Sequence, residues 1–538
     1  MIEQLQGGDS PFDLTTVRIA ALPIVDRYLQ RLRLDELLAR HLPHEDARTT
    51  LAVSRTIGVV VRNLALGREP LYAVGEWAAR HEPGLLGLDA GDADRLNDDR
   101  VGRALGKLFD ADRATMLSEL IVGAIAEFEV DCSQLHNDST SITLHGAYTG
   151  ASELARGKAV PMPKRGHSKD HRPDLKQLVL ILTVSRDGAV PIVHRLVDGN
   201  ITDDTTHIET WDTLVGIAGR AGFLYVADSK LCTGTQMRHI DAAGGRFVTI
   251  LPRTRKEATE LRSWLAADVP TWTEAERRQP RRKADTDDVW STTPAPFPSA
   301  EGYRIVVVHS TSKQRRDESS RQNRLDRARH KLDELNTKLA SPRARSTNLA
   351  HLTDTIDDML APLSVDRYLA YSVKPYVEER YRQEKRGRPG TDTRYRKLTK
   401  HRFRVSYTID ADTIRTDAAS DGCFPLITND QTLTDTELLA AYRYQPNLEK
   451  RHHELKGVMD ATPVALHTTH RIDALFACQF IALLCRSLIE RDLRTATQRT
   501  NTTLPLYPEG RNCPAPTTAR LIDLFHNTAR HHLSLIHI

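Results

Sequence analysis

The stretch YRYQPNLEKRHHELK, residues 442–456, places one acid and one lysine at helical spacing inside a basic run. Proline is best tolerated in the first turn of a helix, because its missing N–H has no intrahelical partner there. We therefore predict a helix that begins at Pro446, with Glu449 in its first turn. Seven residues separate Glu449 from Lys456, so their side chains are expected on one face, roughly 10 Å apart. Taken alone, the stretch is also compatible with a solvated amphipathic helix.

Two aspartates upstream stand where strands are predicted to end. Asp138 closes a short extended run in SQLHNDSTSITLHG (133–146), and the apolar run Phe223 to Ala227 predicts a buried strand that ends at Asp228. A carboxylate in such a place is costly unless a cation or a partner neutralises it. With Glu449, the two aspartates would suit a pair of Mg²⁺ ions about 4 Å apart, which is an arrangement used for in-line attack at phosphodiesters. Turn or helix-capping roles stay open for both aspartates.

Around Glu449 the chain resembles the DDE transposases of bacterial insertion sequences, in the cut-and-paste group with a Tyr-x2-Arg-x3-Glu-x6-Lys signature. The signature falls on Tyr442, Gln445, Glu449 and Lys456, with glutamine at the position of the arginine. Three further runs resemble the same group, and they are GHSKDHRPDLKQ (166–177), DGNITDDTT (198–206) and TPVALHTTHRIDALFACQFIALL (462–484). The resemblance extends from about residue 90 to 495.

The resemblance implies that Asp138, Asp228 and Glu449 are the catalytic residues and the ligands of Mg²⁺, with Mn²⁺ able to substitute. It implies that Tyr442, position 445 and Lys456 contact phosphates at the transposon end. The expected partners are double-stranded DNA, as terminal inverted repeats and as target, and a second copy of the chain in the DNA complex. The expected location is cytoplasmic and associated with the nucleoid.

Two other functions stay open on the same scaffold. One is a catalytically inactive relic or repressor that binds DNA without cutting it, and the other is a structure-selective nuclease. The sequence contains no G-x4-G-K-[ST], HExxH or GxSxG motif, which argues against ATP hydrolysis and against the commonest metalloprotease and serine-hydrolase designs.

Length and composition describe a protein with more than one core. A chain of 538 residues exceeds a single hydrophobic core, and its net charge of +4 is small for this length. Six cysteines form no CxxC pair, which favours reduced thiols. The first residues, MIEQLQGGDSPFD, do not have the pattern of a signal peptide. The apolar run from Ala474 to Cys485 is too short to span a bilayer, so we predict a core helix.

The order of predicted elements indicates an α/β fold with a ribonuclease H-like core and a mixed sheet. Residues 1–127 are predicted to form a helical N-terminal domain for DNA binding or dimerisation, with Arg48, Arg55, Arg62, Arg100 and Arg103 on or beside its helices. Residues 128–253 read as strand, hairpin, helix, strand, helix, strand, with Arg186-Asp187-Gly188 as the hairpin turn. An inserted subdomain (254–415) with a coiled-coil-like segment, the second part of the core (416–495) and a C-terminal tail helix (496–538) are predicted to follow.

The most basic stretch, Tyr371 to Arg404, lies in the predicted insertion. Basic groups neutralise phosphates and aromatic rings stack on bases, so this stretch suits nucleic acid, although a solvated charge run would look the same. The residues predicted to contact DNA outside the signature are Lys169, Arg172, Arg386, Arg388, Arg394, Arg396 and Lys397.

Overall fold

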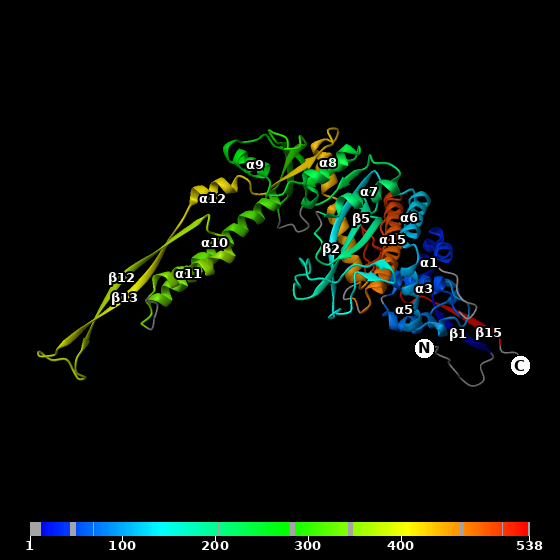
Figure 1. Cartoon of the computed structure of the whole chain (residues 1–538), viewed down its shortest axis with the longest axis horizontal. Helices are drawn as coiled ribbons and strands as arrows, with labels where there is room; N and C mark the ends of the chain where they lie inside the picture. The colour runs from blue at the N-terminus through cyan, green and yellow to red at the C-terminus, as the bar shows by residue number, and fades with distance from the viewer. Residues whose placement is uncertain are drawn as a thin grey trace. The chain divides into compact units, whose positions relative to one another are not determined.

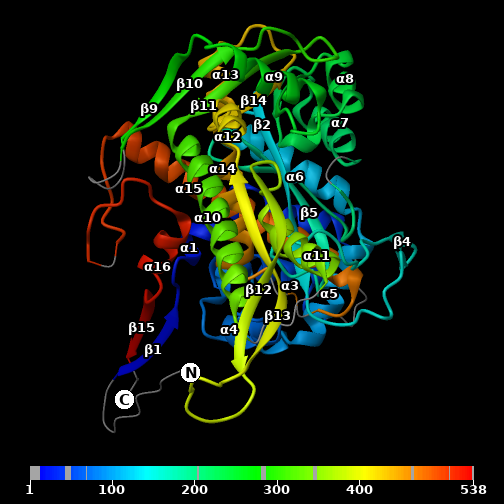
Figure 2. The same cartoon turned by 90° about the vertical axis from the view of Figure 1, so that its left-hand side faces the viewer.

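The computed structural model describes residues 12–42, 50–67, 69–202, 205–279, 286–342, 348–461, 464, 466–507 and 509–535. Of the features named above, Arg48, two residues of the 198–206 run, three of the 462–484 run and both chain ends lie outside these ranges. The chain forms two compact units (Figures 1 and 2). The first unit is Met1–Ile250, Thr428–Thr432 and Ala440–Ile538, and the second is Leu251–Ile427 and Leu433–Leu439.

The first unit is built on a mixed sheet. Its strands are β2 (Gln134–Leu144), β5 (Lys176–Ser185), β6 (Pro191–Asp198), β7 (Leu224–Val226) and β8 (Arg246–Ile250), in the spatial order β6-β5-β2-β7-β8. The β2–β5 and β5–β6 pairs are antiparallel, whereas β7 runs parallel to both β2 and β8. Helices α7 (His207–Ala218) and α8 (Gly234–Ala242) connect the later strands. The predicted order of elements from 128 to 253 is therefore confirmed.

Local chemistry explains these elements. The run QLVLILTVS has no polar alternation, and β5 is buried along almost its whole length. Gly188 has a φ of +74°, which favours glycine, and it lies in the turn between β5 and β6. Thr233 caps α8 by accepting a hydrogen bond from the backbone N–H of Gln236. A small ladder of β3 (Leu154–Ala155) and β4 (Lys158–Ala159) lies in the connection from β2 to β5.

The N-terminal part is mostly helical, with one correction at its start. Its helices are α1 (Leu22–Arg31), α2 (Leu34–His41), α3 (Val53–Leu66), α4 (Val74–Ala79), α5 (Asp98–Asp110) and α6 (Arg113–Phe128). The first described element is instead a strand, β1 (Phe12–Arg18), which pairs antiparallel with β15 (Ala529–Leu535). The prediction of a C-terminal tail helix is therefore wrong for most of its range, because only α16 (Thr518–Leu524) and the end of α15 are helical there. Backbone pairing between the two ends of the chain leaves no local signal in either segment.

Arginines of this part that were considered for DNA binding have internal partners. Arg62 is 1% exposed in its side chain and pairs with Asp26 at 2.7 Å and with Asp35 at 2.9 Å. Arg55 pairs with Asp89 and Asp92. A buried guanidinium needs such carboxylates to offset its desolvation, so Arg62 is a packing residue.

The core helix of the first unit is α15 (Thr469–Arg499). It is longer than the predicted apolar run, and by length and composition it could cross a membrane, but 94% of its most apolar window is buried inside the fold. The prediction of a core helix is confirmed. Helices α13 (Asp435–Tyr442) and α14 (Gln445–His453) precede it, and α14 continues into a π-helical turn, η7 (Glu454–Val458).

The second unit contains strands and a helical hairpin. Strands β9 (Thr273–Arg278), β10 (Asp288–Pro294), β11 (Arg304–Ser310) and β14 (Cys423–Thr428) have the order β14-β11-β10-β9, accompanied by α9 (Lys256–Ala267) and α12 (Ala411–Ala418). Helix α10 (Thr311–Ala340) is the predicted coiled-coil-like segment, and it packs its leucine seam on α11 (Leu349–Leu360). The same core includes one end of a long hairpin, β12 (Leu369–Gln383) and β13 (Tyr395–Ile409).

Candidate active site

The pairing of β2 with β7 makes Asp138 and Asp228 neighbours. The parallel ladder runs from Gln134↔Leu224 to His136↔Val226, so each aspartate lies two residues beyond the last pair on its own strand. Adjacent strands lie about 5 Å apart, so the two backbones are close at this level. Both side chains are partly exposed. The first and fourth strands of the predicted order, β2 and β7, are thus neighbours in the sheet.

The predicted position of Asp138 needs a correction. Asp138 does not end its strand, because β2 continues for six residues to Leu144, paired with β5 throughout. The polar run Ser139 to Thr143 hid this continuation, since its side chains do not alternate in hydrophobicity. Asp228 does follow its strand, and it also caps the short helix at Ser229–Leu231 by accepting from the N–H of Lys230 at 3.0 Å.

Helix α14 carries Glu449 and begins at Gln445, one residue before the predicted start at Pro446. Gln445 joins the helix to β2, because its side-chain nitrogen donates to the carbonyl of Asn137 at 2.9 Å and its oxygen lies 3.0 Å from Nδ1 of His136. Gln445 is buried and both ends of its amide have partners within the fold, while its contact with DNA stays a prediction. It positions the helix on the sheet, and Glu449 stays exposed one turn further on.

Tyr442 lies among the three predicted acids. Burial raises the pKa of its phenol well above the ordinary value, and the charges of Asp228, Asp138 and Glu449 raise it further. All three carboxylates therefore act on one hydroxyl group, although they come from β2, from the end of β7 and from α14. Over the ranges that the structure describes, no three His, Cys, Asp or Glu side chains lie close enough to hold a metal ion. The three acids are thus near enough for their charges to act on the Tyr442 phenol.

Of the predicted DNA-contacting lysines, Lys169 lies beside Asp138 and Lys456 lies beside Asp170. Lys169 Nζ lies 3.4 Å from Oδ1 of Asp138 and donates to the carbonyl of Ser139 at 2.6 Å. Lys456, in the π-helical turn, pairs with Asp170 at 2.8 Å. Because the turn interrupts the α-helix, Lys456 does not continue the regular α-helical face of Glu449. Arg172, in contrast, forms an exposed two-pronged pair with Asp174.

The two histidines beside Glu449 point in different directions, as expected of adjacent residues on a helix. His452 is buried, with Nε2 3.9 Å from Oδ2 of Asp138, while His453 is exposed. Sequence reasoning did not connect His452 with Asp138.

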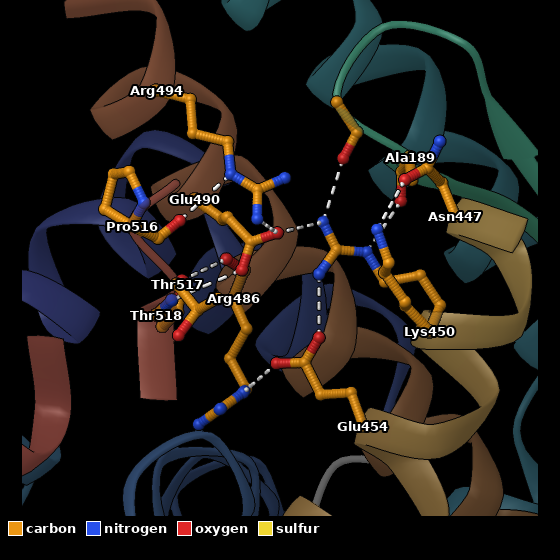
Figure 3. A network of polar contacts seen from close by, with 12 residues as sticks. Ala189, Asn447, Lys450, Glu454, Arg486, Glu490, Arg494, Pro516, Thr517 and Thr518 are labelled. Atoms are coloured by element: carbon orange, nitrogen blue, oxygen red, sulfur yellow. Dashed lines mark hydrogen bonds and ion pairs between the residues drawn. The ribbon is translucent and has the colours of Figure 1, made fainter. Parts of the chain in front are cut away.

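A buried ionic network holds α14 in place, and sequence reasoning missed it (Figure 3). Arg451 donates to the carbonyls of Gly188 and Ala189 in the β5–β6 turn and to Glu454 at 2.7 Å. Glu454 also accepts from Arg486 of α15 at 2.8 Å. Burial raises the pKa of Glu454, but the charges of Arg451 and Arg486 outweigh it and hold the pKa below its usual value.

The network continues to the C-terminal part of the chain. Glu490 pairs with Arg494 at 2.9 Å and accepts from the N–H of Thr518, while Arg494 donates to the carbonyl of Pro516 (Figure 3). The only sequence signal was the spacing of Arg451 and Glu454, three residues apart on a helix. The network fixes the helix that presents Glu449.

The other predicted DNA contacts belong to the second unit. Arg386, Arg388 and Arg394 lie in the exposed connection between β12 and β13. Arg396 and Lys397 lie on β13, where Lys397 pairs with Glu379 at 2.6 Å. All five side chains are exposed.

The fold and site thus define a mixed α/β protein with a carboxylate-rich site on its central strands. Residues 14–122 match a family model described as "Domain of unknown function (DUF4277)". No curated protein matches the sequence. Among solved structures the chain is similar to a "Cryo-EM structure of piggyBac transposase synaptic complex with hairpin DNA (SNHP)". The identity is 7%, the TM-score is 0.40, and the match covers 93% of this chain and 79% of that chain.

Proposed function

We propose that this chain is a DDE-type DNA transposase of an insertion sequence, which binds terminal inverted repeats and cuts and rejoins DNA with Mg²⁺. The observation that carries the proposal is the gathering of Asp138, Asp228 and Glu449 around Tyr442 from three separate elements. The sheet order β6-β5-β2-β7-β8, with β5 antiparallel to its neighbours, supports a ribonuclease H-like core. The N-terminal match supports it too, because that domain is found in transposase-like proteins.

The residues of the site fit a divalent cation in type. Asp138, Asp228 and Glu449 would hold Mg²⁺, or Mn²⁺ in its place, because hard cations prefer carboxylate oxygens. When bound, such ions activate water or a DNA 3′-hydroxyl and stabilise the leaving oxygen. The clustered negative charge that raises the pKa of Tyr442 is the observation that favours a cation here.

The chain's own side chains would orient the DNA strand. With its raised pKa, the Tyr442 phenol stays protonated at neutral pH and can donate a hydrogen bond to a phosphate oxygen. Lys169 pairs with Asp138, and Lys456 pairs with Asp170, which is the next residue after Lys169. Their ammonium groups offset part of the acidic charge, so an anionic strand can approach. Gln445 begins α14 and Glu454 directly follows it. Both side chains are buried and hydrogen-bonded, so they hold in place the helix that carries Glu449.

Cleavage of a DNA duplex tests the proposal. The substrate is a labelled duplex that carries the inverted repeats flanking the encoding DNA, incubated with Mg²⁺. Asp138→Asn, Asp228→Asn and Glu449→Gln should each lower cleavage by more than roughly 100-fold, because even groups that only support metal ligands contribute about 10- to 100-fold. Glu209→Gln is the matched control, since Glu209 belongs to the same unit and its side chain is 70% exposed. Wild-type cleavage by any of the three variants would refute the assignment.

The rival is a DNA-binding protein without cleavage, a relic or repressor on the same scaffold. One observation favours it: within the described ranges, no three ligand-type side chains are close enough to hold an ion. Calorimetric titration with Mn²⁺ separates the two functions. A transposase should bind the ion saturably and lose this binding in Asp228→Asn, whereas a relic should bind none.

A further inference from the structure

The hairpin of β12 and β13 is a long ribbon with a free outer half. Its two strands have 15 residues each and form a two-stranded sheet of their own, about 50 Å long (Figures 1 and 2). Near its base, Leu369, Val373 and Val405 pack on the α10–α11 core. From Glu379 to Thr399 the side chains are exposed, apart from partial burial at Gln383 and Thr393. No hydrophobic core therefore holds the outer half.

The charges of this outer half are mostly basic. Between Glu379 and Thr399 the acids are Glu379, Glu384 and Asp392, whereas the bases are Arg380, Arg382, Lys385, Arg386, Arg388, Arg394, Arg396 and Lys397. An isolated two-stranded ribbon is only marginally stable in water, and this excess of like charge weakens it further. The composition therefore favours binding of an anionic partner, which would stabilise the outer half of the ribbon.

The strand register separates the two faces. Residues directly opposite each other share a face, and faces alternate along each strand. One face carries Arg380, Arg382 and Arg396, because Arg380 pairs with Leu398 and Arg382 pairs with Arg396. The other face carries Tyr381 opposite Lys397, whose charge is matched by Glu379. The register thus gathers arginines on one face and tyrosine on the other.

The Arg382↔Arg396 pair is the strongest sign of a ligand. Like charges directly opposite on a sheet are destabilising, and these two exposed arginines form the last pair but one of the ladder. A phosphate between them would convert the repulsion into attraction, since arginine forks match phosphate oxygens. A two-stranded ribbon is also an element that fits the major groove of B-DNA.

We propose that this arginine face, defined as Arg380, Arg382 and Arg396, docks in a groove of double-stranded DNA. The inference deepens the proposed function, because it names the element and the face that hold the duplex. In this arrangement the basic loop residues Arg386, Arg388 and Arg394 lie beyond the ladder end, where they reach the flanking backbone. The tyrosine face points away from the groove.

Binding of the full chain to DNA tests the inference. The probe is a fluorescent 30-base-pair duplex of random sequence without Mg²⁺, followed by anisotropy over a range of salt concentrations. Arg382→Ala/Arg396→Ala should weaken binding roughly 10- to 100-fold. It should also lower the slope of log K against log salt by about 2, one for each lost phosphate contact. Lys397→Ala is the control on the opposite face, and the proposed docking replaces the expectation that Lys397 contacts DNA. This variant should change affinity by less than about threefold, because Lys397 faces away from the groove and is paired with Glu379.

Three outcomes decide the question. Wild-type duplex affinity in the double variant, or an equal loss in Lys397→Ala, overturns the inference. A loss confined to a single-stranded probe also overturns it, because the partner would then be single-stranded nucleic acid. The melting temperature of the double variant should equal or exceed that of wild type, since a repulsive pair is gone. Duplex binding is measured without Mg²⁺ and cleavage is measured with it, so failure of the ribbon inference and failure of the proposed function are distinguishable.

Discussion

Replacing Glu454 with glutamine removes the carboxylate that two buried arginines share. The side chains of Arg451, Glu454 and Arg486 are 4%, 11% and 3% exposed, and both arginines lie within 2.8 Å of Glu454. A glutamine has nearly the same shape but offers only one acceptor oxygen, and its amide group turns donors toward the second guanidinium. Breaking a buried pair in this way costs about 3–5 kcal/mol, because it leaves a charge buried without its partner.

The loss of stability in Glu454→Gln should be measured in α14 and α15, the helices that the network joins. The protein has two compact units, so a melting temperature alone does not show in which unit a substitution acts. Hydrogen exchange of peptides from α14 and α15 reports the local opening free energy directly. In Glu454→Gln this free energy should fall by about 3–5 kcal/mol, while peptides from α10 and α11 in the second unit should be unchanged. Glu209→Gln, an exposed carboxyl change in the same unit, should alter it by less than about 0.5 kcal/mol.

A second variant makes the reasoning refutable. If the two side chains act as a pair, Glu454→Met combined with Arg486→Met should be less destabilised than the sum of the single changes. The argument fails if Glu454→Gln changes opening by under about 1 kcal/mol, or if the double change is fully additive. Since Glu454 lies five residues after Glu449, loss of cleavage should accompany loss of protection in α14.

Two further predictions concern the contact between α14 and β2. Gln445→Arg, which restores the signature residue, should lower the melting temperature and leave duplex affinity unchanged. The side chain is buried against His136 and Asn137, and an added guanidinium would lack a carboxylate there. Tighter DNA binding would contradict this prediction. Burial lowers the pKa of His136 from 6.5 to about 4, against the opposing effect of the hydrogen bond that Oε1 of Gln445 accepts from the ring. His136 therefore contributes stability above pH 6.5 that is lost as pH falls toward 4, and melting temperatures of His136→Gln should fall less steeply across that window than those of wild type.

Some features of the site were predictable from short stretches of sequence, whereas others depend on contacts between distant segments. Strand, hairpin and helix positions around Asp228 and Glu449 were predictable, because each rests on a short-range rule: a buried apolar run, an Asp-Gly turn, a proline in a first helical turn. The position of Asp138 within β2 was not, since a polar strand between two neighbours has no alternation to read. Gln445 and Arg451 were also out of reach, because their partners lie about 300 and 260 residues away in the sequence.

The sequence by itself determined the kinds of elements in the chain, their order, and the acids that were candidates for chemistry. Backbone torsion preferences and side-chain periodicity act over a few residues, so they can be read from a linear string. Only the tertiary structure decided that both chain ends pair as β1 and β15, that the three acids act together on Tyr442, and that the arginines of the ribbon share a face. These features depend on strand register and on contacts between distant segments. Hydrogen bonding and burial select them only when the whole chain folds.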